Sequence, residues 1–184
     1  MVEEAVDRRI QRTRRLLQQA LDKLLEKKDL SDLSIQDIAN EASVNRATFY
    51  DHYPDKFALL KCMVGCRFQE LLTDRKVNFE HNCRSELRDL VRAVCDYVTR
   101  MRKLEPPMES AIIGALREML VAGIKQHAPA TSAPEIPAAA ASWAIYGAAK
   151  EWAQTPNRCP ADEIANTVTT LVSPILRVSS EESH

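Results

Sequence analysis

Hydrophobic residues recur at helical spacing along most of the chain, and this periodicity predicts an all-α protein. In residues 7–27 the apolar positions follow at intervals of seven, four and three residues and so share one helix face: Ile10, Leu17, Leu21 and Leu24. The same reasoning predicts longer helices over residues 55–78, 85–103, 108–126, about 138–154 and from 160 onward. Prolines predict breaks at Pro106-Pro107, through a loop at 127–137, and at Ser173-Pro174, which should end or kink the last helix.

Between residues 28 and 55 the pattern changes to two short helices separated by a three-residue turn. Ser34 is expected to cap the first, residues 35–42, with Asp37 completing a variant of the capping box. The second, residues 46–52, follows the turn 43–45 and ends before Pro54. This is helix-turn-helix organisation, in which the second short helix enters the major groove of DNA. Its exposed side offers polar groups for phosphates and base edges: Asn45, Arg46, Thr48, Tyr50 and His52.

Residues 33–60 resemble the DNA-binding signature of the tetracycline-repressor (TetR) family. The similarity rests on the spacing of Ile38-Ala39, Ala42, Val44, Thr48-Phe49-Tyr50, His52-Tyr53 and Lys56. It implies an N-terminal three-helix DNA-binding domain, residues 1–54, and a helical effector-binding and dimerisation domain, residues 55–184. It also implies inward packing of Phe49 and Tyr53. The family usually has glycine where this chain has Ser43, a position where positive φ is expected.

The resemblance assigns roles within the motif residue by residue. Ser34 would cap its helix and touch phosphate. The residues implied to face the groove are Asn45, Arg46, Ala47 and Thr48. Those implied to hold phosphate are Tyr50, His52 and Lys56. Among them, Arg46 is expected to read a base directly, because a guanidinium can pair bidentately with guanine.

The helices after residue 55 carry two further sets of candidates. Small side chains in the Ala-rich helix would let another helix approach closely, and the last helix has an apolar stripe. The resemblance implies that these two helices pair with those of a second subunit, with an internal core contact as the alternative: Ala140, Ala144, Gly147, Ala148, Ile164, Val168, Leu171, Val172 and Ile175. It also implies an effector pocket for a largely apolar molecule, with ordinary core as the alternative: Phe68, Val91, Cys95, Val98, Met108, Ile112, Leu116, Met119, Trp143 and Tyr146.

Bulk charge does not mark this chain as a nucleic-acid-binding protein. The net charge is −1, and residues 1–60 hold ten basic against eleven acidic side chains. DNA binding must therefore come from a local patch and a shaped motif. The exception is a run of arginines with no acid among residues 8–15, which is either a solvated helix face or a basic patch: Arg8, Arg9, Arg12, Arg14 and Arg15.

These features together predict a sequence-specific transcription regulator, a repressor that binds a palindromic operator on double-stranded DNA as a homodimer. A small, unidentified effector would release it. The sequence lacks a membrane span and a signal region, which predicts a cytoplasmic protein. Gly-rich phosphate loops, the HExxH motif and CxxC pairs are absent, so neither an enzyme, a cofactor nor a resident metal is expected.

Two alternatives remain open. Cys62 and Cys66 share a helix face, with His81 and Cys83 nearby in sequence, and could make the protein a redox- or metal-responsive regulator. Small, buried thiols are the plainer interpretation of those cysteines. The other alternative is a helical protein-interaction module whose motif no longer reads DNA, which the charge of the first sixty residues keeps open.

Overall fold

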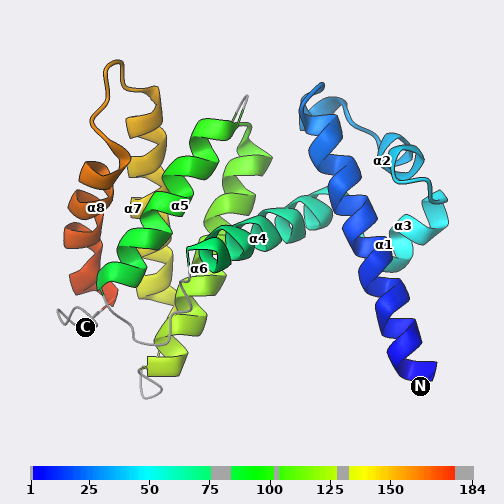
Figure 1. Ribbon diagram of the computed structural model, residues 1–184, viewed down its shortest axis with the longest axis horizontal. Coiled ribbons are helices and arrows are strands. Elements are labelled where there is room, and N and C mark those ends of the chain that lie inside the picture. Colours follow the sequence, from blue (N-terminus) through cyan, green and yellow to red (C-terminus); the bar gives the residue numbers. More distant parts are fainter. Residues whose placement is uncertain (1, 76–83, 102–103, 128–132, 177–184) are drawn as a thin grey trace. The chain divides into compact units, whose positions relative to one another are not determined.

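The computed structural model describes residues 2–75, 84–101, 104–127 and 133–176, with side chains from residue 8 onward, and throughout these ranges it contains helices and connecting turns but no strand. The elements appear in Figure 1 in chain order: α1 (Val2–Leu25), the 3-10 turn η1 (Leu30–Asp32), α2 (Ile35–Glu41), α3 (Arg46–His52), α4 (Lys56–Asp74), α5 (Arg84–Arg100), α6 (Pro106–His127), α7 (Glu135–Gln154) and α8 (Ala161–Leu176). The predicted all-α fold is confirmed.

The chain forms two compact units. The first contains Met1–Val64 together with Arg102–Ala111, and the second contains Gly65–Met101 and Ile112–His184. The expected domain boundary after residue 54 therefore lies inside the first unit, because the opening turns of α4 and α6 contribute to it.

In the first unit, α1 packs on α2 and α3, which also pack on each other. Leu17 and Leu21 of α1, Ile38 of α2 and Phe49 of α3 are fully buried. An ion pair between Lys23 of α1 and Glu41 joins α1 to the end of α2. The recognition motif thus rests on one small apolar core.

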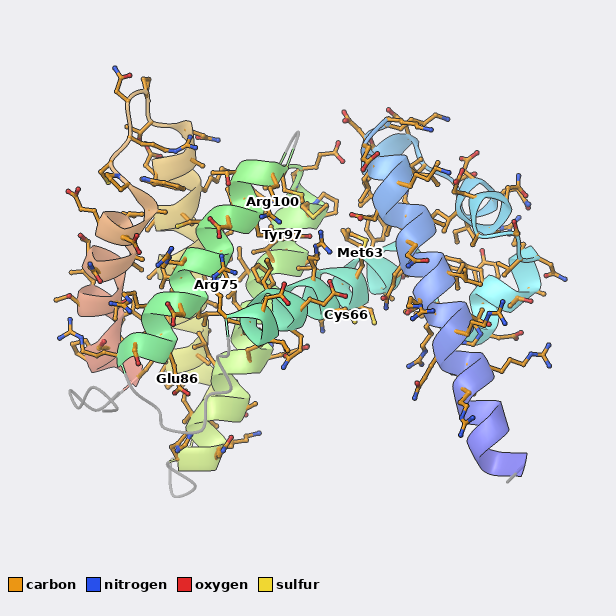
Figure 2. All side chains as sticks on the ribbon, in the orientation of Figure 1. Met63, Cys66, Arg75, Glu86, Tyr97 and Arg100 are labelled. Atoms are coloured by element: carbon orange, nitrogen blue, oxygen red, sulfur yellow. The ribbon has the colours of Figure 1, made fainter. Side chains whose placement is uncertain are left out.

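The second unit is built around α5, which packs on both α7 and α8, while α7 and α8 pack along each other. Leu90, Val91 and Val94, which lie within about one turn of α5, are fully buried. Tyr97 of α5 (Figure 2) lies with its ring centroid 4.8 Å from that of Phe68 on α4. An ion pair between Arg75, which directly follows α4, and Asp96 of α5 also joins these two segments.

The prolines interrupt the helices less than the sequence analysis predicted. Pro106 and Pro107 open α6, and Pro137 lies in the first turn of α7 instead of in a loop. A first turn has no intrahelical partners for its N–H groups, so proline costs it no hydrogen bond. Pro174 lies inside α8, which continues to Leu176.

Among the described helices, none combines the length and the apolar character that crossing a membrane would require.

Candidate DNA-binding site

Ser34 and Asp37 form the predicted capping box at the start of α2. The Asp37 backbone N–H donates to Ser34 Oγ at 3.1 Å, and the Ser34 N–H donates to Asp37 Oδ2 at 2.9 Å. The Ser34 hydroxyl also donates to Asp37 Oδ2 at 2.6 Å. These hydrogen bonds from Ser34 lower the pKa of the Asp37 carboxyl below its ordinary value. Ser34 is exposed, so its position as a helix cap also leaves it accessible to a phosphate.

The turn between α2 and α3 is a Schellman-type helix end. The Val44 N–H donates to the Ala39 carbonyl at 2.9 Å, and the Ser43 N–H donates to the Asn40 carbonyl at 3.0 Å. Ser43 has φ 55°, the left-handed conformation that glycine adopts most easily. The departure from glycine noted in the sequence therefore falls on a backbone position where it matters.

Asn45 caps α3 and so fixes where the second short helix begins. Its Oδ1 accepts hydrogen bonds from the backbone N–H groups of Ala47, at 2.5 Å, and Thr48, at 3.2 Å. This occupies the side-chain carbonyl of a residue that was predicted to face the groove. The Asn45 amide group is left to donate outward from an exposed position.

One face of α3 is anchored in the core and the opposite face is exposed. Phe49 is fully buried, with its ring 5.7 Å from that of Tyr50 and 6.2 Å from that of Tyr53. Arg46, Ala47 and Tyr50 are exposed, while Thr48 and His52 are half-buried.

Arg46 and Tyr50 form a pair on this exposed face. Arg46 Nη2 donates to the Tyr50 hydroxyl at 3.1 Å, and the guanidinium lies 5.5 Å from the ring centroid. The Arg46–Tyr50 pair presents a cation and a phenol side by side on one helix turn, which suits contact with a base edge and a neighbouring phosphate.

Lys56 occupies a different environment from the one predicted for a phosphate contact. Its half-buried ammonium donates to the backbone carbonyls of Leu30 at 2.7 Å, Ser31 at 3.3 Å and Leu33 at 2.7 Å. An ammonium has three donors, and three carbonyls surround this one. Lys56 therefore acts as a clamp from the start of α4 to the loop that precedes α2.

Glu105, just before α6, holds the same loop from a second direction. Its Oε2 accepts the Leu30 N–H at 2.8 Å across 75 residues of sequence. This contact is not predictable from the sequence, because no local pattern relates two residues so far apart.

Tyr53, at the end of α3, joins three helices of the first unit. Its hydroxyl lies 3.3 Å from Gln18 Nε2 and 3.6 Å from Cys62 Sγ, and the Arg14 guanidinium lies 5.9 Å from its ring centroid. Burial, with a further contribution from Cys62, raises the pKa of Tyr53 to about 12. Tyr53 is buried, as the resemblance implied.

The cysteines do not form a metal-binding cluster within the described ranges, where no group of three or more His, Cys, Asp or Glu side chains could hold an ion. Cys62 is half-buried and accepts from Gln18 Nε2 at 3.3 Å, while Cys66 (Figure 2) is exposed. His81 and Cys83 lie outside the described residues.

The candidate pocket residues fall into four groups. Most are buried in the second unit: Phe68, Val91, Cys95, Val98, Ile112, Leu116 and Tyr146. Met119 is half-buried there. Met108 is buried but belongs to the first unit. Trp143 has 64% of its surface exposed and so lies on the outside of α7, where it cannot line an interior cavity of its own chain.

The candidate dimer residues divide between surface and core. Exposed members are Ala140, Ala144, Gly147, Leu171 and Ile175, and half-buried ones are Ala148 and Ile164. Val168 and Val172 are buried inside their own unit, so they make the internal contact that was the alternative. Trp143, expected in the pocket, is exposed on α7 together with Ala140, Ala144 and Gly147.

Comparison with known proteins gives matches in both parts of the chain. Residues 16–63 match the family described as bacterial regulatory proteins, tetR family. An uncharacterised HTH-type transcriptional regulator of Bacillus subtilis (strain 168), YxbF, is 49% identical over 71 residues. That match covers 38% of this chain and 19% of YxbF, so the chain spans a small part of its curated relative.

Solved structures match over nearly the whole chain. A TetR transcriptional regulator from Streptococcus agalactiae 2603V has a TM-score of 0.58 at 21% identity, covering 92% of this chain and 98% of that one. The Thermus thermophilus repressor FadR, in complex with lauroyl-CoA, has a TM-score of 0.53 at 17% identity, covering 93% of this chain and 98% of that one. At these identities the likeness establishes a shared fold.

Proposed function

This chain belongs to the TetR family of bacterial regulatory proteins, and from that premise we propose that it is a repressor that binds a palindromic operator as a homodimer and is released by a small, largely apolar effector. The observation that carries the proposal is the exposed face of α3. The Asn45 cap fixes where α3 begins, and Phe49 anchors the opposite face of the helix in the core. The exposed face presents the Arg46–Tyr50 pair. A rigid helix with a polar outer face is what major-groove readout requires.

The homodimer is supported by an apolar face on α7 and α8. Large apolar side chains are exposed there: Ile136 at 72%, Trp143 at 64%, Leu171 at 69% and Ile175 at 40%. An added Cβ at Gly147 would meet nothing within 4 Å in its own chain, so the missing side chain leaves room for a partner. Paired helices from two copies would bury this face, and a two-fold dimer would place two recognition helices about 34–36 Å apart.

The effector proposal rests on the interior of the second unit. The buried candidate residues there are almost entirely hydrocarbon, and burial raises the pKa of the Cys95 thiol to about 11, so that it stays neutral. The similar FadR of Thermus thermophilus binds lauroyl-CoA. An apolar molecule would favour one conformer of this unit over another and so shift the population away from the DNA-binding state.

Selection from a pool of randomised duplexes tests the DNA-binding proposal. We expect enrichment of an inverted repeat with half-sites about one helical turn apart. Arg46→Ala should lower affinity and relax the preference at one position in each half-site, whereas equal losses on all sequences would make Arg46 a phosphate contact. If no sequence is enriched, the operator-binding proposal is wrong, and a helical protein-interaction module becomes the favoured function.

Sedimentation equilibrium tests the dimer. Trp143→Ser with Leu171→Ser should weaken association by at least about tenfold, because large apolar anchors dominate such interfaces. Phe57→Ser is a matched control, since Phe57 is 50% exposed but belongs to the first unit. A wild-type monomer at micromolar concentration, or equal effects of both variants, would contradict the assignment of this face.

Thermal shift and DNA release with lauroyl-CoA test the effector proposal. Binding to the folded state should raise the melting temperature and lower the affinity for the selected operator. The control is coenzyme A without the acyl chain. No change in either quantity would exclude long acyl chains, and an equal response to coenzyme A alone would contradict an apolar effector.

A further inference from the structure

The helix-turn-helix is itself electrostatically unsuited to DNA. Residues 29–55 contain one basic side chain, Arg46, against six acidic ones, a formal net charge of −5. Lys56, the next cation along the chain, directs its ammonium to three backbone carbonyls. Because charge neutralisation of phosphates supplies most non-specific DNA affinity, this motif needs attraction from elsewhere.

The first half of α1 carries the opposite charge. Residues 8–15 hold five arginines and no acidic residue, a formal net charge of +5. All five side chains are exposed: Arg8, Arg9, Arg12, Arg14 and Arg15. The buried face of α1 begins at Leu17, while Ile10 is 38% exposed, so this stretch contributes little to the core. We call residues 8–15 the arginine arm.

The C-terminal end of the arginine arm lies beside the end of α3. The Arg14 guanidinium lies 5.9 Å from the ring centroid of Tyr53, the residue that ends α3. Both belong to the first unit, and in Figure 1 the N-terminal turns of α1 run on beyond α3. Seven residue steps of helix span about 10 Å, enough to follow several charges of a DNA strand.

We propose that the arginine arm of α1 is the main phosphate-binding element of this protein, bound to the DNA backbone beside the groove that α3 enters. The inference rests on the proposed DNA-binding function and assigns affinity and sequence preference to different elements. The arm supplies affinity without sequence preference, and the Arg46 side of α3 supplies preference with little net charge. A solvated helix face would carry interspersed acids, which the arm lacks.

The test replaces four arginines of the arm by glutamine: Arg8→Gln, Arg9→Gln, Arg12→Gln and Arg15→Gln. Arg14 is kept for its contact with Tyr53, and glutamine is a good helix former at exposed positions. Affinity for a mixed-sequence duplex is measured by fluorescence anisotropy between about 50 and 200 mM salt. The magnitude of the slope of log K against log salt should decrease by about three to four per protomer. The affinity at low salt should decrease by at least about tenfold.

A variant of equal charge change serves as the control, with four exposed cations outside the first unit changed to glutamine: Arg67, Arg100, Arg117 and Lys125. It should keep the wild-type slope. Melting temperatures of both variants should match the wild type, which separates lost contacts from lost folding.

The outcomes separate this inference from the proposed function. If an operator is enriched but the arm variant keeps the wild-type salt slope, the role of the arm in phosphate binding is wrong and the operator-binding function stands. No enrichment, with duplex binding that depends on the arm, would support the arm and reject sequence-specific regulation. Equal losses of affinity in the arm variant and its control would mean that total charge, and not the position of the arm, determines binding, and would overturn the inference. Wild-type protein that binds no duplex would also overturn it.

Discussion

The first unit adds polar contacts at the ends of its short helices to a small apolar core, whereas the second unit packs long helices by apolar faces that are buried along their length. The capping box at Ser34, the Asn45 cap and the Lys56 clamp all fix where short helices begin. In the second unit, α5, α7 and α8 bury stripes that include Leu90, Val94 and Ile145. Helices of seven residues cannot be stabilised by length, so specific end contacts decide the geometry of the recognition motif.

This difference also predicts how each unit responds to the loss of a single contact. End contacts are few and directional, so losing one should shift a short helix. Buried stripes share the packing among many residues, so the second unit should tolerate a changed core side chain while it keeps its fold.

Alkaline pH should unfold the second unit before the first. Burial raises the pKa of Cys95 from 9.0 to about 11, and that of Tyr53 from 10.0 to about 12. Each group is neutral in the folded state and ionises more easily when unfolded. Stability is therefore complete below the unfolded pKa and declines between 9 and 11 for the second unit, and between 10 and 12 for the first.

Two probes follow the units separately. Both tryptophans, Trp143 and Trp152, lie on α7 and report on the second unit by fluorescence, while hydrogen exchange of α3 amides reports on the first. Cys95→Ala should remove the earlier loss. A single transition that is unchanged in Cys95→Ala would contradict the assignment.

Lys56→Met should destabilise the first unit by about 2–3 kcal/mol, because hydrogen bonds to a charged group are lost and the part-buried carbonyls of Leu30 and Leu33 lose a partner. Urea unfolding measures the change. The amides of Leu30 and Leu33 should exchange faster, whereas the salt slope of DNA binding should stay the same. A slope smaller by about one would restore the phosphate contact that the sequence suggested.

Thr169→Val should stabilise the second unit by about 1–2 kcal/mol. Thr169 is 3% exposed and its Oγ1 has no hydrogen-bond partner in the described structure, so the folded state bears the cost of a dehydrated hydroxyl. Thr167→Val is the control, because Thr167 is exposed and its hydroxyl donates to the Glu163 carbonyl. Destabilisation by Thr169→Val would mean that the hydroxyl makes a bond worth keeping.

Contacts between residues close in sequence could be predicted from the sequence, whereas contacts between distant residues could not. The cap at Ser34, the turn at Ser43 and the buried side of α3 were predictable, because each depends on residues within five positions. The environment of Lys56 was not, because its acceptors lie 23 to 26 residues away and are backbone carbonyls, which every residue has. Trp143 was assigned to the interior because an aromatic residue at helical spacing fits core and surface equally well.

Ser43→Gly should stabilise the first unit by about 0.5–1 kcal/mol. At φ 55°, a Cβ crowds the backbone and costs about 1–2 kcal/mol, part of which glycine returns through its larger unfolded-state entropy. Asn157, with φ 52° between α7 and α8, is the matched control in the second unit. Asparagine tolerates this conformation better than serine, so Asn157→Gly should change stability less. If the two substitutions have equal effects in urea unfolding, strain at Ser43 is not what distinguishes this turn; if Ser43→Gly alone stabilises, the recognition motif carries a strain that a single glycine would remove.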